Sequence, residues 1–157
     1  MPSAPPLRLR NFDYSAPGAY LITITTAGRS PSLGRLTQGG VELSALGKLV
    51  AQELGRTEAL RSGVIMDAVA IMPDHIHFIV LLTDQAPGGS NISRVVNGFK
   101  AAVTSGYRRR GGDQTAHIWQ RGFHDRVIRS DRDLAEARRY VLENPAAAWL
   151  KQVSHAR

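Results

Sequence analysis

The chain has 157 residues, with 20 lysines and arginines against 13 aspartates and glutamates, so its formal charge is +7. A hydrophobic content of 43% predicts one folded domain over residues 1–157 and excludes a disordered chain. The absence of cysteine excludes a disulfide scaffold, a zinc ribbon and a thiol nucleophile. No stretch approaches the ~18 apolar residues of a membrane-spanning helix, and the N-terminus lacks a signal-peptide core. We therefore expect a cytoplasmic protein with no membrane partner.

The basic residues are concentrated in the second half of the chain. Residues 1–93 carry 7 basic and 7 acidic side chains, whereas residues 94–139 carry 11 basic and 5 acidic ones. Clustered arginine is typical of proteins that bind the nucleic-acid backbone, and a solvated face is the alternative. With two arginines of the N-terminal segment, this stretch supplies the residues expected on a nucleic acid: Arg8, Arg10, Arg94, Lys100, Arg108, Arg109, Arg110, Arg121, Arg126 and Arg129.

The first sixty residues predict an arm, a strand, a hairpin and a helix. Residues 1–18 hold four prolines and indicate an irregular arm. Residues 19–27 alternate with period two and are rich in β-branched side chains, as in a strand. The turn-rich segment that follows leads into a small hairpin around Gly39 and Gly40. Ser44 is then the expected N-cap of a helix whose apolar residues recur at helical spacing to about Arg61.

Two apolar strands are expected next, at residues 64–72 and 75–83. Only Pro73 and Asp74 separate them, so they must pair as an antiparallel hairpin. A flexible connection follows, and Ser90 or Asn91 is expected to cap a second helix that runs to about residue 110.

The last part predicts one more extended segment and a third helix. Residues 118–129 are the extended segment, and Ser130 or Asp131 caps the helix. Pro145 is expected to end this helix at Asn144, because proline disfavours helical backbone at the residue before it. The whole order predicts an α+β, ferredoxin-like (split βαβ) antiparallel sheet with helices on one face and an additional C-terminal helix.

The sequence His75-Ile76-His77 opens the second strand of the predicted hairpin. Side chains two apart on a strand point to the same face, so both imidazoles can approach one ion while Ile76 turns into the core. This pattern is compatible with a metal site. The alternative is a pair of partly exposed histidines near a turn.

Tyr140 and Asn144 are four residues apart on the last helix and therefore share one face. A phenol can act as a covalent nucleophile, and an amide oxygen is a hard ligand suited to Mg²⁺ or Mn²⁺. The alternatives are a core tyrosine with a solvated hydroxyl and an asparagine that ends a helix. Combined with the histidine pair, these residues predict DNA cleavage by transesterification.

The segment MPDHIHFIV resembles the His-hydrophobic-His motif of single-tyrosine HUH transposases. Over about Arg8 to Trp149 the chain resembles REP-associated tyrosine transposases, in the segments NFDYSAPGAYLITITT, VAIMPDHIHFIVLL, SRVVNGFKAAVT, IWQRGFHDRVIR and RYVLENPAAAW. The resemblance implies His75, His77 and Asn144 as ligands of Mg²⁺ or Mn²⁺. It implies Tyr140, on the C-terminal catalytic helix, as the nucleophile that forms a 5′-phosphotyrosine. The implied substrate is single-stranded DNA, often a hairpin from a repetitive extragenic palindrome.

The segment WQRGFHDRVIR departs from the family pattern at His124 and Arg126, near which the family usually has aromatic residues and a histidine. Trp119 is expected to pack the sheet against the last helix, with stacking on a DNA base as the alternative. Two other functions remain open at this point: a DNA-hairpin-binding module that no longer cuts, and a metal-dependent hydrolase that activates water. A monomer is favoured over a homodimer.

Overall fold

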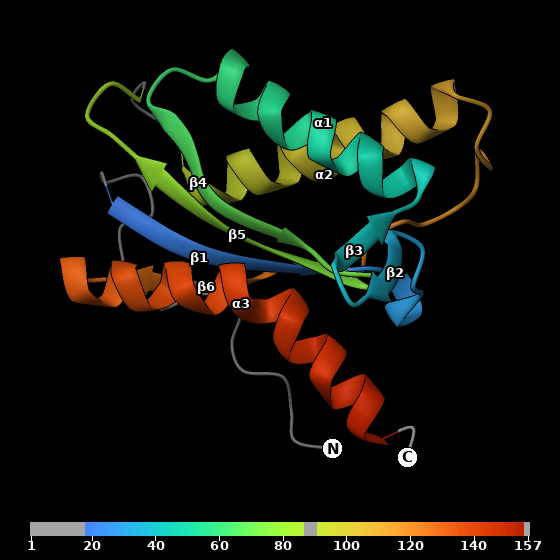
Figure 1. The fold of residues 1–157 in the computed structure, drawn as a ribbon. Helices are drawn as coiled ribbons and strands as arrows, with labels where there is room; N and C mark the ends of the chain where they lie inside the picture. Colours follow the sequence, from blue (N-terminus) through green and yellow to red (C-terminus); the bar gives the residue numbers. More distant parts are fainter. Residues whose placement is uncertain (1–17, 87–90, 156–157) are drawn as a thin grey trace.

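The structure is a computed structural model that describes residues 18–86 and 91–155. Its centre is a four-stranded antiparallel sheet in the order β4-β5-β1-β6. The strands are β1 (Gly18–Thr25), β4 (Val64–Ile71), β5 (His75–Leu82) and β6 (His124–Ile128). Helices α1 (Ala45–Leu60) and α2 (Ile92–Arg109) cover one face, and α3 (Asp131–His155) lies on the other (Figure 1). The ferredoxin-like α+β fold with an additional C-terminal helix is confirmed.

A small hairpin beside the sheet completes the described fold. It consists of β2 (Gly34–Thr37) and β3 (Gly40–Leu43), and the short 3-10 helix η1 (Ala27–Arg29) precedes it. The prediction of a hairpin around Gly39 and Gly40 is therefore confirmed. Within residues 18–86 and 91–155, no helix combines the length and apolar character needed to cross a bilayer.

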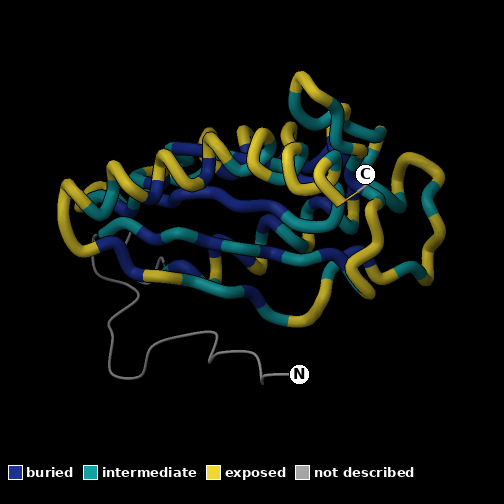
Figure 2. The backbone as a smooth tube through the Cα atoms, turned by 60° about the horizontal axis from the view of Figure 1, so that its bottom comes forward, coloured by how far each residue is buried: buried dark blue, intermediate teal, exposed yellow. Residues whose placement is uncertain are grey.

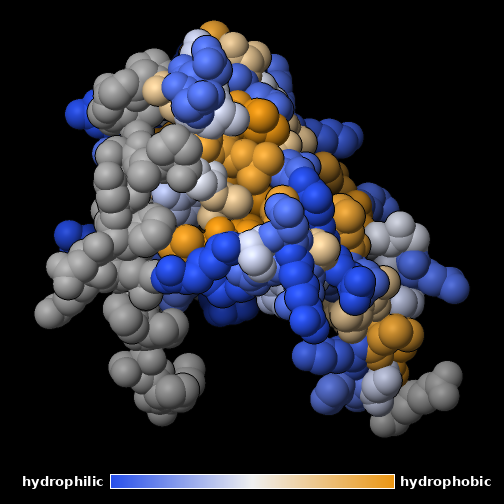
Figure 3. Space-filling view, turned by 90° about the vertical axis from the view of Figure 1, so that its left-hand side faces the viewer, coloured by the Kyte–Doolittle hydropathy of each residue, from blue (hydrophilic) through white to orange (hydrophobic). Residues whose placement is uncertain are grey.

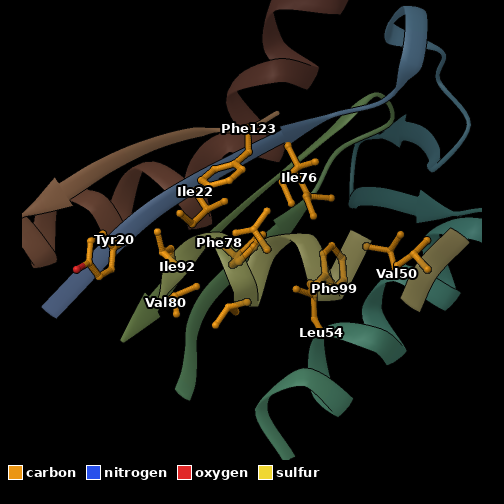
Figure 4. Close-up of a cluster of buried hydrophobic side chains, with 14 of the residues drawn as sticks. Tyr20, Ile22, Val50, Leu54, Ile76, Phe78, Val80, Ile92, Phe99 and Phe123 are labelled. Carbon is orange, nitrogen blue, oxygen red and sulfur yellow. The ribbon is translucent and has the colours of Figure 1, made fainter. Parts of the chain in front are cut away.

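The main core lies between the sheet and the two helices α1 and α2. Period-two alternation turns Tyr20, Ile22 and Ile24 of β1 toward these helices, and all three are fully buried. Phe78 of β5 and Phe99 of α2 meet in the same layer, with ring centroids 6.0 Å apart (Figure 4). Buried backbone runs through the strands, whereas the outer turns of the helices are exposed (Figure 2).

Each helix begins at a side chain that caps its first turn. The Ser44 hydroxyl accepts a hydrogen bond from the Gly47 amide at 3.0 Å, and the Asn91 side chain accepts one from the Arg94 amide at 3.0 Å. The Ser130 hydroxyl does the same for the Asp133 amide at 3.0 Å. Asn91 is thus the cap of α2, while Ser90 lies outside the described residues. The capping predictions at residues 44, 91 and 130 are confirmed.

The predicted end of the third helix at Asn144 is wrong, because α3 continues through Pro145 to His155. Proline removes one intrahelical hydrogen bond and its ring crowds the preceding turn, which can bend a helix without ending it. Figure 1 shows α3 changing direction along its length. The residues that follow, Ala146, Ala147 and Ala148, are strong helix formers, and α3 also contacts the hairpin strands β2 and β3.

The extended segment before α3 is shorter than predicted. Only His124–Ile128 pairs with β1 as a strand, while Trp119 makes an isolated bridge with Thr26. Trp119 packs against Phe99 of α2, with ring centroids 6.0 Å apart, so the expectation that it packs on the last helix is wrong. The indole lies on the opposite side of the sheet from α3.

Helix α3 is seated on its face of the sheet by a small apolar cluster and two ion pairs. Ala137 and Val141 are buried in a cluster that also contains Ala68, Ala70, Ile79 and Ile128. Arg138 donates two hydrogen bonds to Asp67 of β4, at 2.6 and 2.8 Å. On the other side Arg126 of β6 pairs with Asp133 at 2.7 Å. The helix is therefore held to both edge strands, and this fixes the position of the residues it presents.

Candidate active site

Strand β5 presents His75 and His77 to the face covered by α3. Their ring centroids lie 4.7 Å apart in an edge-to-face arrangement, and Ile76 between them is fully buried on the opposite face. The predicted arrangement of two imidazoles on one face with the intervening isoleucine in the core is confirmed. The pair stands at the start of β5, directly after the Pro73-Asp74 turn.

Each imidazole is held by a hydrogen bond at Nδ1. The Nδ1 atom of His75 lies 2.7 Å from Oδ1 of Asp74, and that of His77 lies 2.8 Å from Oγ1 of Thr23. Burial raises the pKa of Asp74, but the hydrogen bond and charge of His75 and of the nearby Arg29 lower it more. The pKa of Asp74 therefore lies below its ordinary value. The ionised carboxylate can only accept, so Nδ1 of His75 donates this hydrogen bond, which leaves Nε2 as the ring atom that can bind a metal ion.

The Asp74 carboxylate has a second partner, Arg29, which lies 3.2 Å from Oδ2. Arg29 has a positive φ of 53°, a conformation that is uncommon for residues other than glycine. The backbone carbonyl of Asp74 also accepts hydrogen bonds from the amide and the hydroxyl of Thr26, at 3.0 Å each. These contacts hold the turn in place and thereby fix the orientation of His75.

His77 is the more buried of the two histidines, with 6% of its surface exposed. Burial, together with the charge of His75, lowers the pKa of His77 to about 4. The ring is therefore neutral at pH 7. A neutral ring that donates from Nδ1 to the Thr23 hydroxyl leaves Nε2 free to bind a metal ion.

This pKa predicts a loss of stability in mild acid. Because the pKa of His77 in the folded protein lies below the 6.5 of an ordinary histidine, the unfolded chain takes up this proton first as the pH falls. The contribution is complete above about pH 6.5 and is lost as the pH falls toward 4. The stability lost between pH 7 and pH 4.5 should amount to on the order of 2 kcal/mol.

Urea unfolding at pH 7 and pH 4.5 measures this contribution. We expect His77→Gln to lose less stability between the two pH values than the wild type, because glutamine keeps a polar side chain but does not titrate. His155→Gln, which changes an exposed histidine near the end of α3, is the matched control. An equal pH dependence in wild type and His77→Gln would contradict the prediction.

Tyr140 approaches the histidines from α3. Its ring centroid is 5.4 Å from that of His77, and 52% of its surface is exposed. A phenol in this position is accessible to a large substrate while its ring contacts that of His77. Asn144 follows one helical turn later on the same side of α3 and is half-buried.

The donor set suits a hard divalent cation. Two imidazole Nε2 atoms are available, and an amide oxygen from Asn144 is a typical third ligand for Mg²⁺ or Mn²⁺. Across residues 18–86 and 91–155 there is no cluster of three or more His, Cys, Asp or Glu side chains that could bind a metal without such an amide. The choice of ion and the role of Asn144 stay predictions.

The predicted nucleic-acid residues are spread over several surfaces. Arg8 and Arg10 lie outside the described residues, and six others are exposed: Arg94, Arg109, Arg110, Arg121, Arg126 and Arg129. Lys100 donates to the carbonyls of Gln120 and Gly122, at 3.0 and 2.9 Å, and burial lowers its pKa.

Three arginines of the set also have protein partners. Arg108 reaches the Ala116 carbonyl at 3.5 Å, Arg110 the Gln52 side chain at 2.9 Å and Arg126 the Asp133 carboxylate at 2.7 Å. Contacts of these residues with nucleic acid stay predictions.

The positive charge gathers on the layer formed by α1 and α2. Residues 45–61 and 92–110 carry eight basic and two acidic side chains, a net charge of +6, whereas α3 carries four of each. A groove of about 560 Å³ between the two helices is lined by Arg56, Arg61 and Arg109. This face lies on the opposite side of the sheet from Tyr140. At one end of the molecule, apolar side chains gather between hydrophilic ones (Figure 3).

Residues 48–144 match the family described as IS200-like transposases. The chain belongs to this family. The matched segment contains the two histidines and Tyr140, and it ends at Asn144. Belonging to the IS200-like transposases confirms the family-level resemblance seen in the sequence.

Two further comparisons find a protein of similar sequence and a solved structure of similar fold. An uncharacterized protein of Haemophilus influenzae is 27% identical over 157 residues, covering 88% of this chain and 86% of that protein. The solved structure of a REP-associated tyrosine transposase bound to a REP hairpin has the same fold, with a TM-score of 0.64. It is 19% identical and covers 90% of this chain and 74% of that one.

Several residues that shape this candidate site were not found from the sequence. Thr23 and Asp74 hold the histidines, and Arg29 holds Asp74. Asp74 adjoins His75 in the sequence and could have been suspected as its partner. Thr23 is brought to His77 only by the pairing of β1 with β5, which no local pattern specifies.

Proposed function

We propose that this IS200-like transposase is a metal-dependent single-stranded DNA endonuclease and strand transferase that uses Tyr140 as its nucleophile. The observation that carries the proposal is the contact between the exposed Tyr140 ring and the ring of His77. A histidine pair with both Nδ1 atoms engaged and both Nε2 atoms left for a metal ion, next to an accessible phenol, supports phosphoryl transfer to tyrosine.

The chemistry follows from the groups present. A divalent cation held by His75, His77 and Asn144 would polarise a phosphate oxygen and offset the negative charge that develops on it. The Tyr140 hydroxyl loses its proton and attacks phosphorus, the Oη–P bond forms, and the bond from phosphorus to the 3′ oxygen breaks. The leaving 3′ oxygen takes up a proton. The product is a 5′-phosphotyrosine, and reversal by a 3′ hydroxyl rejoins the strand without ATP.

We propose a DNA hairpin as the substrate and a monomer as the active form. The REP-associated transposase of similar fold was solved with a REP hairpin, which supports this class of substrate. Tyr140 lies beside a histidine of its own chain, which supports a site complete in one protomer.

The charge of the α1–α2 layer predicts where the DNA backbone binds. We expect the slope of log affinity against log salt concentration to become shallower by about 2.7 when Arg56, Arg61 and Arg109 are replaced by glutamine. This value assumes that each arginine contacts one duplex phosphate, at about 0.9 per contact. The measurement is a salt titration of hairpin binding by fluorescence anisotropy.

The matched control variant replaces Arg129, Arg132 and Arg139, on the other side of the molecule, by glutamine, so it loses the same three positive charges. We expect its salt dependence to stay closer to that of the wild type. A larger change in this second variant would move the DNA backbone to the face that carries Tyr140.

The proposed function is tested with end-labelled hairpin DNA carrying single-stranded flanks, incubated with the protein and Mg²⁺ or Mn²⁺ and run on a denaturing gel. The proposal predicts a labelled band at the mass of a protein–DNA adduct. Free cleaved products without an adduct would instead indicate a hydrolase that activates water. Bound but uncut DNA would indicate a binding module that has lost cleavage.

A further inference from the structure

A groove of about 640 Å³ opens beside Tyr140, between α3 and the β1–β6 part of the sheet. Because β1 separates β5 from β6 in the sheet, this groove extends on the side away from the histidine pair. Its lining comes from three elements and consists of Leu21, Thr23, His124, Asp125, Arg126, Glu136 and Tyr140. None of these residues except Tyr140 has a role in the chemistry described above as a ligand or nucleophile.

The groove is continuous with the reaction site. Tyr140 lines it directly, and Thr23 lines it while its hydroxyl contacts Nδ1 of His77. Thr23 pairs with both His77 and His124 in the sheet, so these three residues form a row across β5, β1 and β6. A strand with its scissile phosphate at Tyr140 therefore has a flanking nucleotide within reach of the groove.

The lining suits a base better than a phosphate. Leu21 gives an apolar floor, and the rings of His124 and Tyr140 give planar surfaces on which a base can stack. The charge of Arg126 is already offset by Asp133 at 2.7 Å. Glu136 adds a carboxylate to the wall, and its contact with Arg132, at 3.4 Å, is long and solvent-exposed, so the carboxylate stays able to accept a hydrogen bond from a ligand. A carboxylate repels a phosphate but accepts a hydrogen bond from the exocyclic amino group of cytosine or adenine.

We propose that this groove binds the base of a nucleotide next to the scissile phosphate, and that Glu136 makes it select cytosine or adenine over thymine. Glu136 is one helical turn before Tyr140, so both side chains face the groove. Thymine presents a carbonyl oxygen where the other two bases present an amino group, and this oxygen would face the carboxylate. The inference rests on the proposed function of the same site.

The first test uses hairpin oligonucleotides with randomised single-stranded flanks, cleaved by the wild type and sequenced at the cut ends. At one flanking position we expect cytosine or adenine to be recovered about tenfold over thymine. In Glu136→Gln the ratio should fall to within about twofold. Glu58→Gln, which removes the same charge from α1, is the control and should keep the wild-type ratio. No preference in the wild type, or an unchanged ratio in Glu136→Gln, would overturn the proposal.

A second arm separates base selection from cleavage. The same pool is bound by Tyr140→Phe and by the double variant Tyr140→Phe/Glu136→Gln, and the bound DNA is sequenced. We expect cytosine or adenine to be enriched at one flanking position in the DNA bound by Tyr140→Phe, and this enrichment to be lost in the double variant. That result would support base binding in the groove, even if the wild type cuts no DNA and the proposed function fails. Identical bound pools would overturn the groove assignment while leaving cleavage by Tyr140 intact.

Discussion

Tyr140→Phe is expected to abolish the covalent protein–DNA product, with a rate loss of at least on the order of 10³-fold, because the substitution removes the attacking oxygen. Hairpin affinity should stay within about threefold of the wild type. The ring contacts of Tyr140 with His77 are kept, and the side chain is 52% exposed, so folding should not suffer. The measurements are adduct formation on a denaturing gel and binding by anisotropy.

Tyr107→Phe is the matched control, since it removes a phenol from α2 on the other side of the sheet. It should form the adduct at the wild-type rate. If Tyr140→Phe still forms the adduct and Tyr107→Phe does not, the nucleophile is Tyr107 and the site described here is not the reaction centre.

The second large effect is expected at the histidine pair. His75→Gln and His77→Gln should each lower the affinity for Mn²⁺ and the cleavage rate by on the order of 10²-fold or more, because each removes an Nε2 ligand. EDTA should abolish cleavage by the wild type. Metal binding is measured by calorimetry on the DNA-free protein, so the result does not depend on activity.

Substitutions at Thr23 and Asp74, the hydrogen-bond partners of the histidines, should give smaller effects of the same kind. Thr23→Val and Asp74→Asn leave both imidazoles in place but remove the groups that orient them, so we expect a loss of 10 to 100-fold in metal affinity. His155→Gln should bind metal as the wild type does. Cleavage at full rate in EDTA, or unchanged Mn²⁺ affinity in both histidine variants, would contradict the metal role.

The fold could be predicted because its main determinants are local. Period-two alternation in β1 and β5, the two-residue connection at Pro73 and Asp74, and capping side chains such as Ser44 and Asn91 each act over a few residues. Together they specify the order of elements, and that order leaves few ways to arrange the sheet. The placement of His75 and His77 on one face followed from the same alternation.

The errors arose where distant contacts override a local rule. Pro145 predicts a helix end, yet α3 continues through it to His155, and α3 contacts the distant strands β2 and β3. Trp119 lacks a local signal for its partner, and the bridge to Thr26 carries it to Phe99 of α2 instead of α3. The groove beside Tyr140 depends in the same way on the register of β1 with β6, which sequence patterns do not specify.

The central claim is that Tyr140 is the residue that becomes joined to DNA. The most direct measurement is mass spectrometry of the adduct after nuclease and protease digestion, which identifies the peptide that carries the added nucleotide. The account predicts a single 5′-phosphotyrosine at Tyr140, formed only with a divalent cation present. An adduct on any other residue, or cleaved DNA with no modified peptide, would contradict it.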